Sequence, residues 1–203
     1  MSREYQVGSR ANVMVRGAPS LYSVQAHRDP TDPNNWIPLM QSWNTICVGM
    51  YDCVHNLLLR NFEDWQPTSI VLGFGGDYDQ PEDPDTTPPA DQGVKQEPAY
   101  TDAYVRKELF RAAIVQAQPS ELTGEHRVHY IAIIRPDDAL TDPDDPDRPY
   151  INEFGLEAYN GTLLAHFVTA EDLDTGRAEQ YAKSNLEWLV IDWEIEFVGS
   201  VPA

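Results

Sequence analysis

The chain has 203 residues, 41% of them hydrophobic, and carries a formal net charge of −19 from 33 acidic and 14 basic side chains. This length suits one domain with its own core, and the charge repels phosphate, so we expect neither nucleic acid nor an anionic membrane as a partner. No apolar run reaches the roughly 18 residues that a transmembrane helix needs. The first five residues do not resemble a secretory signal.

The first 40 residues are predicted to form an extended arm, and residues 41–203 a β-sandwich domain. Val13 and Val15 alternate with polar neighbours, as in a strand. Asp-Pro then occurs twice within residues 27–36, and each proline disfavours helix at the residue before it. An arm of this length is long enough to cross onto an adjacent subunit.

One helix is predicted near residues 44–62. Its apolar residues recur at offsets of three and four, which is the period of an amphipathic helix. Asn44 or Thr45 is a suitable N-cap. Both cysteines, Cys47 and Cys53, lie in this segment, and their separation does not match the spacing of zinc ligands. We therefore expect two reduced and partly buried thiols.

The rest of the chain predicts strands joined by long acidic loops at 77–98 and 136–149, whose prolines and acids cannot bury apolar surface. In the last strand, 185–197, apolar and acidic residues alternate strictly, so one face should meet the core and Glu194 should face water. The predicted fold class is mainly β, an antiparallel β-sandwich with one helix in its N-terminal half. The predicted core residues of the final strand are Leu189, Ile191, Trp193, Ile195 and Phe197.

Three motifs suggest a functional site, but none has the pattern that its chemistry needs. The glycines at 73–76 lack the helix and the lysine of a phosphate-binding loop. The aspartates at 142–147 lack the glycine and glutamate of a calcium-binding loop, although divalent binding by the acidic loops stays open. His126 and His129 are three apart on a strand and should point to opposite faces. We expect no catalytic residues, no metal site and no cofactor.

Residues 151–167, INEFGLEAYNGTLLAHF, predict a β-hairpin. Asn160-Gly161 lies between two apolar runs, and both residues tolerate the positive φ that a two-residue type I′ turn requires. Gly155, inside the first run, predicts a bulge or a close approach to the backbone.

The hairpin also carries a resemblance. The pattern INExGLxxxNGTLLA, followed by Lys183, Ser184 and the alternating final strand, resembles a recurrent module of tailed-bacteriophage structural proteins of the tail, baseplate, neck and fibre. The order of helix, glycine-ended strand, acidic turn, arginine-containing strand, hairpin and final strand matches over the larger part of the chain. Residues 1–40 match nothing in that module, and both acidic loops are longer than it needs.

The resemblance implies assembly rather than catalysis. It implies a non-enzymatic virion component of the tail, neck or collar, baseplate or fibre attachment, located in the virion after assembly in the host cytoplasm. Its partners would be other virion proteins and further copies of itself in a ring or fibre. Two alternatives remain open: a carbohydrate-active or metal-dependent hydrolase, and a carbohydrate-binding module that uses exposed aromatics such as Trp36, Trp43 or Tyr159.

Overall fold

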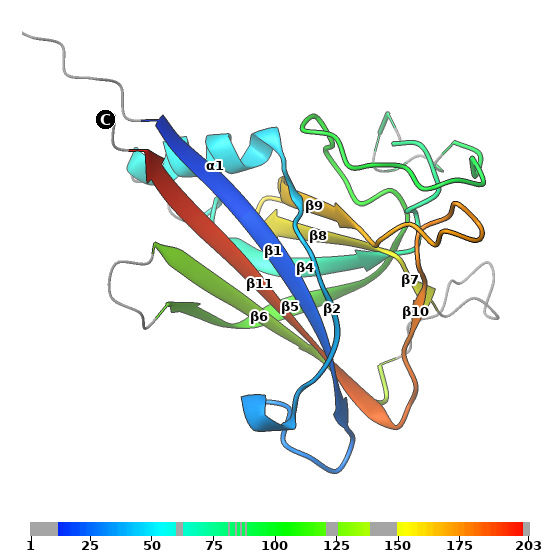
Figure 1. The fold of residues 1–203 in the computed structure, drawn as a ribbon. Coiled ribbons are helices and arrows are strands. Elements are labelled where there is room, and N and C mark those ends of the chain that lie inside the picture. Colours follow the sequence, from blue (N-terminus) through cyan, green and yellow to red (C-terminus); the bar gives the residue numbers. More distant parts are fainter. Residues whose placement is uncertain are drawn as a thin grey trace, which may run out of the picture.

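The structure is a computed structural model, and most of its strands form one nine-stranded antiparallel sheet (Figure 1). One α-helix, α1 (Val48–Leu58), packs against this sheet, and a short second sheet pairs β7 (Tyr150–Ile151) with β10 (Tyr181–Ala182). The prediction of a mainly-β, antiparallel fold with one helix is confirmed. The structure describes residues 12–59, 63–80, 82–83, 85, 87, 89–120, 126–138 and 150–200.

The large sheet has the strand order β2-β1-β11-β6-β5-β4-β8-β9-β3. A short 3-10 helix, η1 (Pro33–Asn35), precedes β2. The strands are β1 (Asn12–Gln25), β2 (Ile37–Gln41), β3 (Thr45–Ile46), β4 (Pro67–Gly73), β5 (Glu108–Pro119), β6 (Arg127–Ile134), β8 (Glu153–Ala158), β9 (Leu163–Val168) and β11 (Glu187–Ser200).

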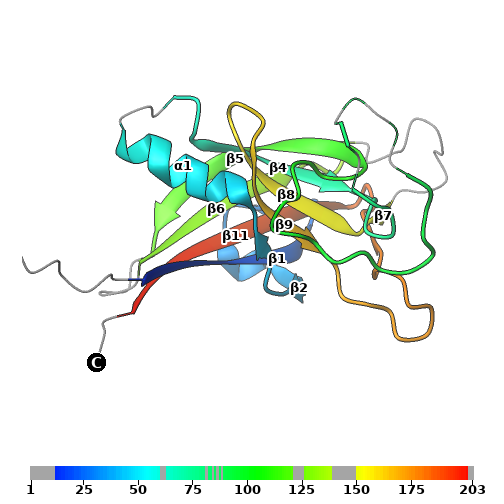
Figure 2. The ribbon, with the colours of Figure 1, turned by 90° about the horizontal axis from the view of Figure 1, so that it is seen from above.

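The two edge strands of the sheet, β2 and β3, follow each other in the chain. The short connection between them brings the two edges together, so the sheet is curled. Between them, the Ser42 N–H donates to the Pro19 carbonyl of β1 at 3.2 Å, and the Asn44 N–H donates to the Gly17 carbonyl at 3.0 Å. β3 then pairs with β9. Two halves of one continuous sheet therefore face each other across the core (Figure 2). The two layers of the predicted sandwich are thus formed by a single curled sheet.

The expected N-terminal arm is, from Asn12 onward, part of this sheet. All 14 residues of β1 pair with β11, and both Leu21 and Val24 are fully buried. A strand that gives its ladder hydrogen bonds and its apolar side chains to the core cannot also reach an adjacent subunit. Residues 12–40 thus belong to the domain, and the remainder of the predicted arm lies outside the described residues.

The final strand, β11, lies between β1 and β6, and its two faces differ. Leu189, Ile191, Trp193 and Ile195 are at most 2% exposed in the main core, and Phe197 packs partly buried against them. The opposite face is covered more than predicted: the Glu194 side chain is 21% exposed, because Arg127 of β6 lies 3.4 Å from it. On the same outer side, Val190 is fully buried in a second cluster.

Helix α1 is shorter than predicted. It begins after Cys47, and residues 44–46, expected as its first turn, instead bridge β1 and β9 in extended form. Residues 60–62 of the predicted helix lie outside the described residues.

Burial, together with the charge of Asp102, raises the pKa of the Cys47 thiol to about 12, and burial raises that of Cys53 to about 11. Both cysteines are free and buried, and no described helix is long and apolar enough to cross a membrane.

Gly49 lets α1 approach the start of β9. A Cβ at this position would lie closer than 3.0 Å to the Leu163 carbonyl oxygen and to the Thr162 methyl group. Replacing a helical glycine by alanine ordinarily stabilises a protein by up to about 1 kcal/mol. Here we expect Gly49→Ala to lower the free energy of unfolding by about 1–2 kcal/mol, because the crowded backbone must shift.

Urea unfolding of Gly49→Ala and of Asp52→Ala, an exposed position of the same helix, tests this expectation. The Asp52 variant should unfold within about 0.5 kcal/mol of the parent protein. A Gly49→Ala variant that is more stable than the parent would show that α1 does not approach β9 so closely.

Candidate functional site

The predicted hairpin is formed by β8 and β9, with Asn160 and Gly161 at its tip. The loop, however, has three residues: the Ala158 N–H donates to the Thr162 carbonyl at 3.0 Å, and the Gly161 N–H donates to the Ala158 carbonyl at 3.0 Å. Gly161 has a φ of 81°, and the Asn160 side chain accepts a hydrogen bond from the Thr162 N–H. A three-residue loop that ends in a left-handed glycine thus takes the place of the expected two-residue type I′ turn.

Gly155, in β8, permits the close approach that its position in the hairpin predicted. A Cβ there would lie 2.5 Å from a methyl group of Val105 and 2.7 Å from one of Leu163. Val105 belongs to the segment before β5, which therefore packs directly on the outer side of the hairpin. A group of buried charged side chains lies beside this contact.

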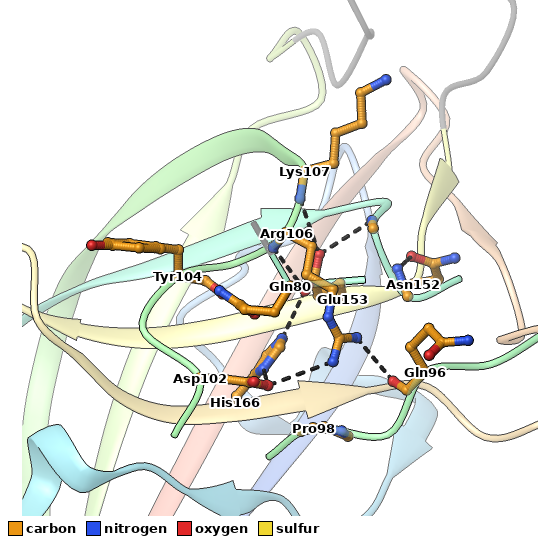
Figure 3. A network of polar contacts seen from close by, with 12 residues as sticks. Gln80, Gln96, Pro98, Asp102, Tyr104, Arg106, Lys107, Asn152, Glu153 and His166 are labelled. Atoms are coloured by element: carbon orange, nitrogen blue, oxygen red, sulfur yellow. Dashed lines mark hydrogen bonds and ion pairs between the residues drawn. The ribbon is translucent and has the colours of Figure 1, made fainter. Parts of the chain in front are cut away.

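The centre of this group is His166 of β9, held between two carboxylates (Figure 3). Its Nδ1 lies 2.6 Å from Asp102 in the segment before β5, and its Nε2 lies 2.7 Å from Glu153 at the start of β8. His166 and Glu153 are fully buried, and Asp102 is 4% exposed. None of the three was predicted to be a site residue.

Glu153 also organises the glycines that follow β4. Its carboxylate accepts hydrogen bonds from the backbone N–H groups of Gly75 at 3.2 Å, Arg106 at 2.9 Å and Lys107 at 3.3 Å. The neighbouring Asn152 accepts one from the Gly76 N–H at 2.9 Å. The N–H groups of this glycine turn thus bind the protein's own side chains.

Arg106 completes the network on its other side. Its guanidinium lies 3.5 Å from Asp102 and donates to the backbone carbonyls of Gln96 at 2.9 Å and Glu97 at 3.0 Å. Two acids therefore face one guanidinium and one imidazole, so the charges balance when His166 is protonated. This network fastens the segment 96–107 to the hairpin.

The pKa values of His166 and Asp102 are both shifted toward their charged forms. Burial, the largest influence, lowers the pKa of His166, but its hydrogen bonds to Asp102 and Glu153 more than compensate, so the net pKa is raised. Burial raises the pKa of Asp102, but the contacts with His166, the Ala99 N–H and Arg106 outweigh it, and the net pKa is lowered. These side chains are at most 5% exposed, so the network lies in the interior of the protein.

An accessible site lies elsewhere, on the outer face of the sheet. A cavity of about 730 Å³ opens there between the segment around η1 and the end of β5, with residues of β6 and β11 also in its lining. We call it the outer groove. Its lining residues are Pro30, Thr31, Pro33, Trp36, Val115, Gln116, Gln118, Pro119, Ser120, His129, Ile131, Ile133 and Asp192.

Trp36 has a fixed place in the outer groove. Its indole N–H donates to the Pro30 carbonyl at 2.9 Å, and its ring packs against Tyr22 of β1 with the centroids 4.9 Å apart. Because its polar atom is already bonded, Trp36 offers the groove carbon surface.

The polar centre of the outer groove is His129 with Asp192. The His129 Nδ1 lies 3.0 and 3.1 Å from the two oxygens of Asp192, and its Nε2 lies 3.6 Å from Glu194. Burial raises the pKa of Asp192, and His129 opposes that shift. His126, predicted to point away from His129, is exposed.

Within the described part of the chain, no cluster of three or more His, Cys, Asp or Glu side chains is arranged to hold a metal ion. The aspartates at 142–147, considered for calcium, lie outside the described residues. Comparison with protein-family models, with curated proteins and with solved structures finds no match to this chain.

Proposed function

We propose that this chain is a non-enzymatic structural subunit of a tailed-phage virion, in the tail, neck or collar, baseplate or fibre attachment. It acts by presenting surfaces to other virion proteins and to copies of itself, and it is located in the virion. The resemblance of its hairpin to such proteins supports this proposal, as does the enclosure of the His166 network, which leaves that network to stabilise the fold. The observation that carries most weight is an apolar surface on α1.

The outward face of α1 is mostly apolar, although the exposed Asp52 lies one turn from Val48 on the same side of the helix. Val48, Tyr51 and Leu58 are 41%, 48% and 79% exposed, and with the exposed His55 they follow one another at offsets of three, four and three. This spacing places them in one stripe along the helix, as in helices that pack against a partner. We call these four residues, together with Leu59, the α1 stripe.

The charge of α1 differs from that of the chain as a whole. The chain has a formal net charge of −19, which opposes close contact between copies. From Val48 to Leu58, however, Asp52 is the one residue with a formal charge at neutral pH. The α1 stripe therefore offers a contact with little charge repulsion, and burying it against a neighbour removes apolar surface from water.

Aspartate substitutions at Leu58 and Leu59 test this role. Because both side chains are exposed, each change should alter the free energy of unfolding by no more than about 0.5 kcal/mol. The same changes should abolish incorporation of the chain into particles, since a buried, unpaired carboxylate at an interface is costly. Incorporation is measured by quantitative mass spectrometry of purified particles that carry the variant.

Leu173→Asp is the matched control. Leu173 is 93% exposed and lies between β9 and β10, away from α1, so this variant should be incorporated like the parent protein. Normal incorporation of the Leu58 and Leu59 variants would remove the α1 stripe from the assembly proposal. Loss of incorporation in all three variants would show a general effect of added charge.

A further inference from the structure

We propose that the outer groove binds a short neutral oligosaccharide, with Trp36 as its apolar platform and Asp192, Gln116 and Gln118 as hydrogen-bonding partners of the sugar hydroxyls. This function goes beyond assembly and depends on a different face of the molecule. The groove has the size and composition of a ligand site. Its 730 Å³ fall within the roughly 300–1,000 Å³ typical of such sites, and its lining combines apolar and polar side chains in similar numbers, as a ligand with carbon faces and many hydroxyls requires.

The platform is organised before any ligand arrives. Pro30 and Tyr22 hold the Trp36 ring in place, so little side-chain freedom remains to be lost on binding. A sugar ring has faces made of C–H groups and a rim of hydroxyls. The carbon surface of Trp36 suits such a face, because an aromatic ring is apolar and has a negative π-face.

The polar groups of the groove suit the rim of hydroxyls. The Gln116 side-chain N–H donates to the Gln118 side-chain oxygen at 2.6 Å, which orients the two amides and leaves an acceptor on Gln116 and a donor on Gln118. A hydroxyl is both a donor and an acceptor, so it can bond to either amide. His129 lies against one side of the Asp192 carboxylate, which has further acceptor positions for hydroxyl protons.

Charge selects a neutral ligand over an acidic one. Among the described residues that line the outer groove, Asp192 and His129 are the ionisable ones, and Glu194 lies 3.6 Å from the other nitrogen of His129. With a formal chain charge of −19, a phosphorylated or carboxylated sugar would meet repulsion both in the groove and around it. Neutral hexose and N-acetylhexosamine units meet none.

The test is titration calorimetry of the intact chain with neutral trisaccharides of glucose, galactose, mannose and N-acetylglucosamine, and with sialyllactose as the acidic probe. At least one neutral trisaccharide should bind, and sialyllactose should bind at least about tenfold more weakly. Trp36→Ala should weaken binding of the neutral ligand at least about tenfold. Trp43→Ala is the matched control, because Trp43 is exposed outside the outer groove and should bind like the parent protein.

Trp36 also packs on Tyr22, so Gln116→Ala, at an exposed position, provides a variant whose folding is not in question. It should weaken the same binding at least about threefold. If no neutral trisaccharide binds at about 10 mM, the proposal is overturned. Binding of a basic peptide such as trilysine in its place would show that the groove selects for positive charge and would not rescue the proposal. Trisaccharide binding that neither variant changes would also overturn it. Incorporation into particles reports on the α1 stripe and should be unaffected by either groove variant, so the two proposals fail separately.

Discussion

Replacing His166 by alanine should lower the free energy of unfolding by about 3–5 kcal/mol, because it leaves Asp102 and Glu153 buried without their shared partner. Two buried carboxylates each lose one charge-assisted hydrogen bond at once, although each keeps its backbone N–H donors. Urea unfolding measures the difference. His55→Ala is the matched control, because His55 is exposed on α1 and its replacement should cost no more than about 0.5 kcal/mol.

The pH dependence of the same difference has a definite sign. The pKa of His166 is raised by folding, so its contribution is complete below its ordinary pKa of about 6.5 and is lost as pH rises through the raised value. The pKa of Asp102 is lowered, so its contribution is complete above about 3.9 and is lost as pH falls through the lowered value. The stability difference between parent and His166→Ala should therefore shrink in alkaline solution. A difference that grows there would contradict an imidazolium at this position.

Replacing Trp193 by alanine should cost about 3–5 kcal/mol, because its side chain is fully buried in the main core and leaves a large cavity. Trp193→Phe should cost far less. Phenylalanine keeps an aromatic ring in the core. The substitution also removes the indole N–H of Trp193, which has no hydrogen-bond partner among the described residues. Thermal unfolding of both variants measures the two costs.

Glu194→Ala, one residue further along β11, is the control for the register of this strand. Glu194 lies 3.4 Å from Arg127 and is partly covered, so we expect a cost of at most about 1 kcal/mol, as for a partly exposed ion pair. Equal melting temperatures for Trp193→Ala and Glu194→Ala would mean that the two residues do not face opposite sides of the sheet.

The sequence predicts elements well where one local pattern determines them. The alternation of β11 follows from a strand with one apolar face, and the apolar runs on both sides of Asn160-Gly161 place a hairpin there. The loop length was missed because Asn-Gly marks a turn without showing that Ala158 and Thr162 form the closing pair. The prediction of a free arm was wrong for residues 12–40, because alternation at Val13 and Val15 predicts a strand but does not identify the strand that pairs with it, β11.

The buried network and the outer groove were beyond the sequence because their members are far apart in the chain. Asp102 and His166 are 64 residues apart, and sequence motifs that rely on a fixed spacing do not cover such a separation. One signal was present: His166 and Glu153 lie in strands that are buried along their whole length, where an ionisable side chain needs partners. Asp192 carried no such signal, because it alternates with apolar residues on the face of the final strand that was expected to meet water, and His129 lies on a different strand.

The most direct test of the central claim is mass spectrometry of purified tailed-phage particles from a host culture that produces this chain, with particles separated from unassembled protein by density. The assembly account predicts that the chain remains with the particles in a fixed ratio to their other structural proteins through repeated purification. Complete absence of the chain from particles that are otherwise whole would contradict it.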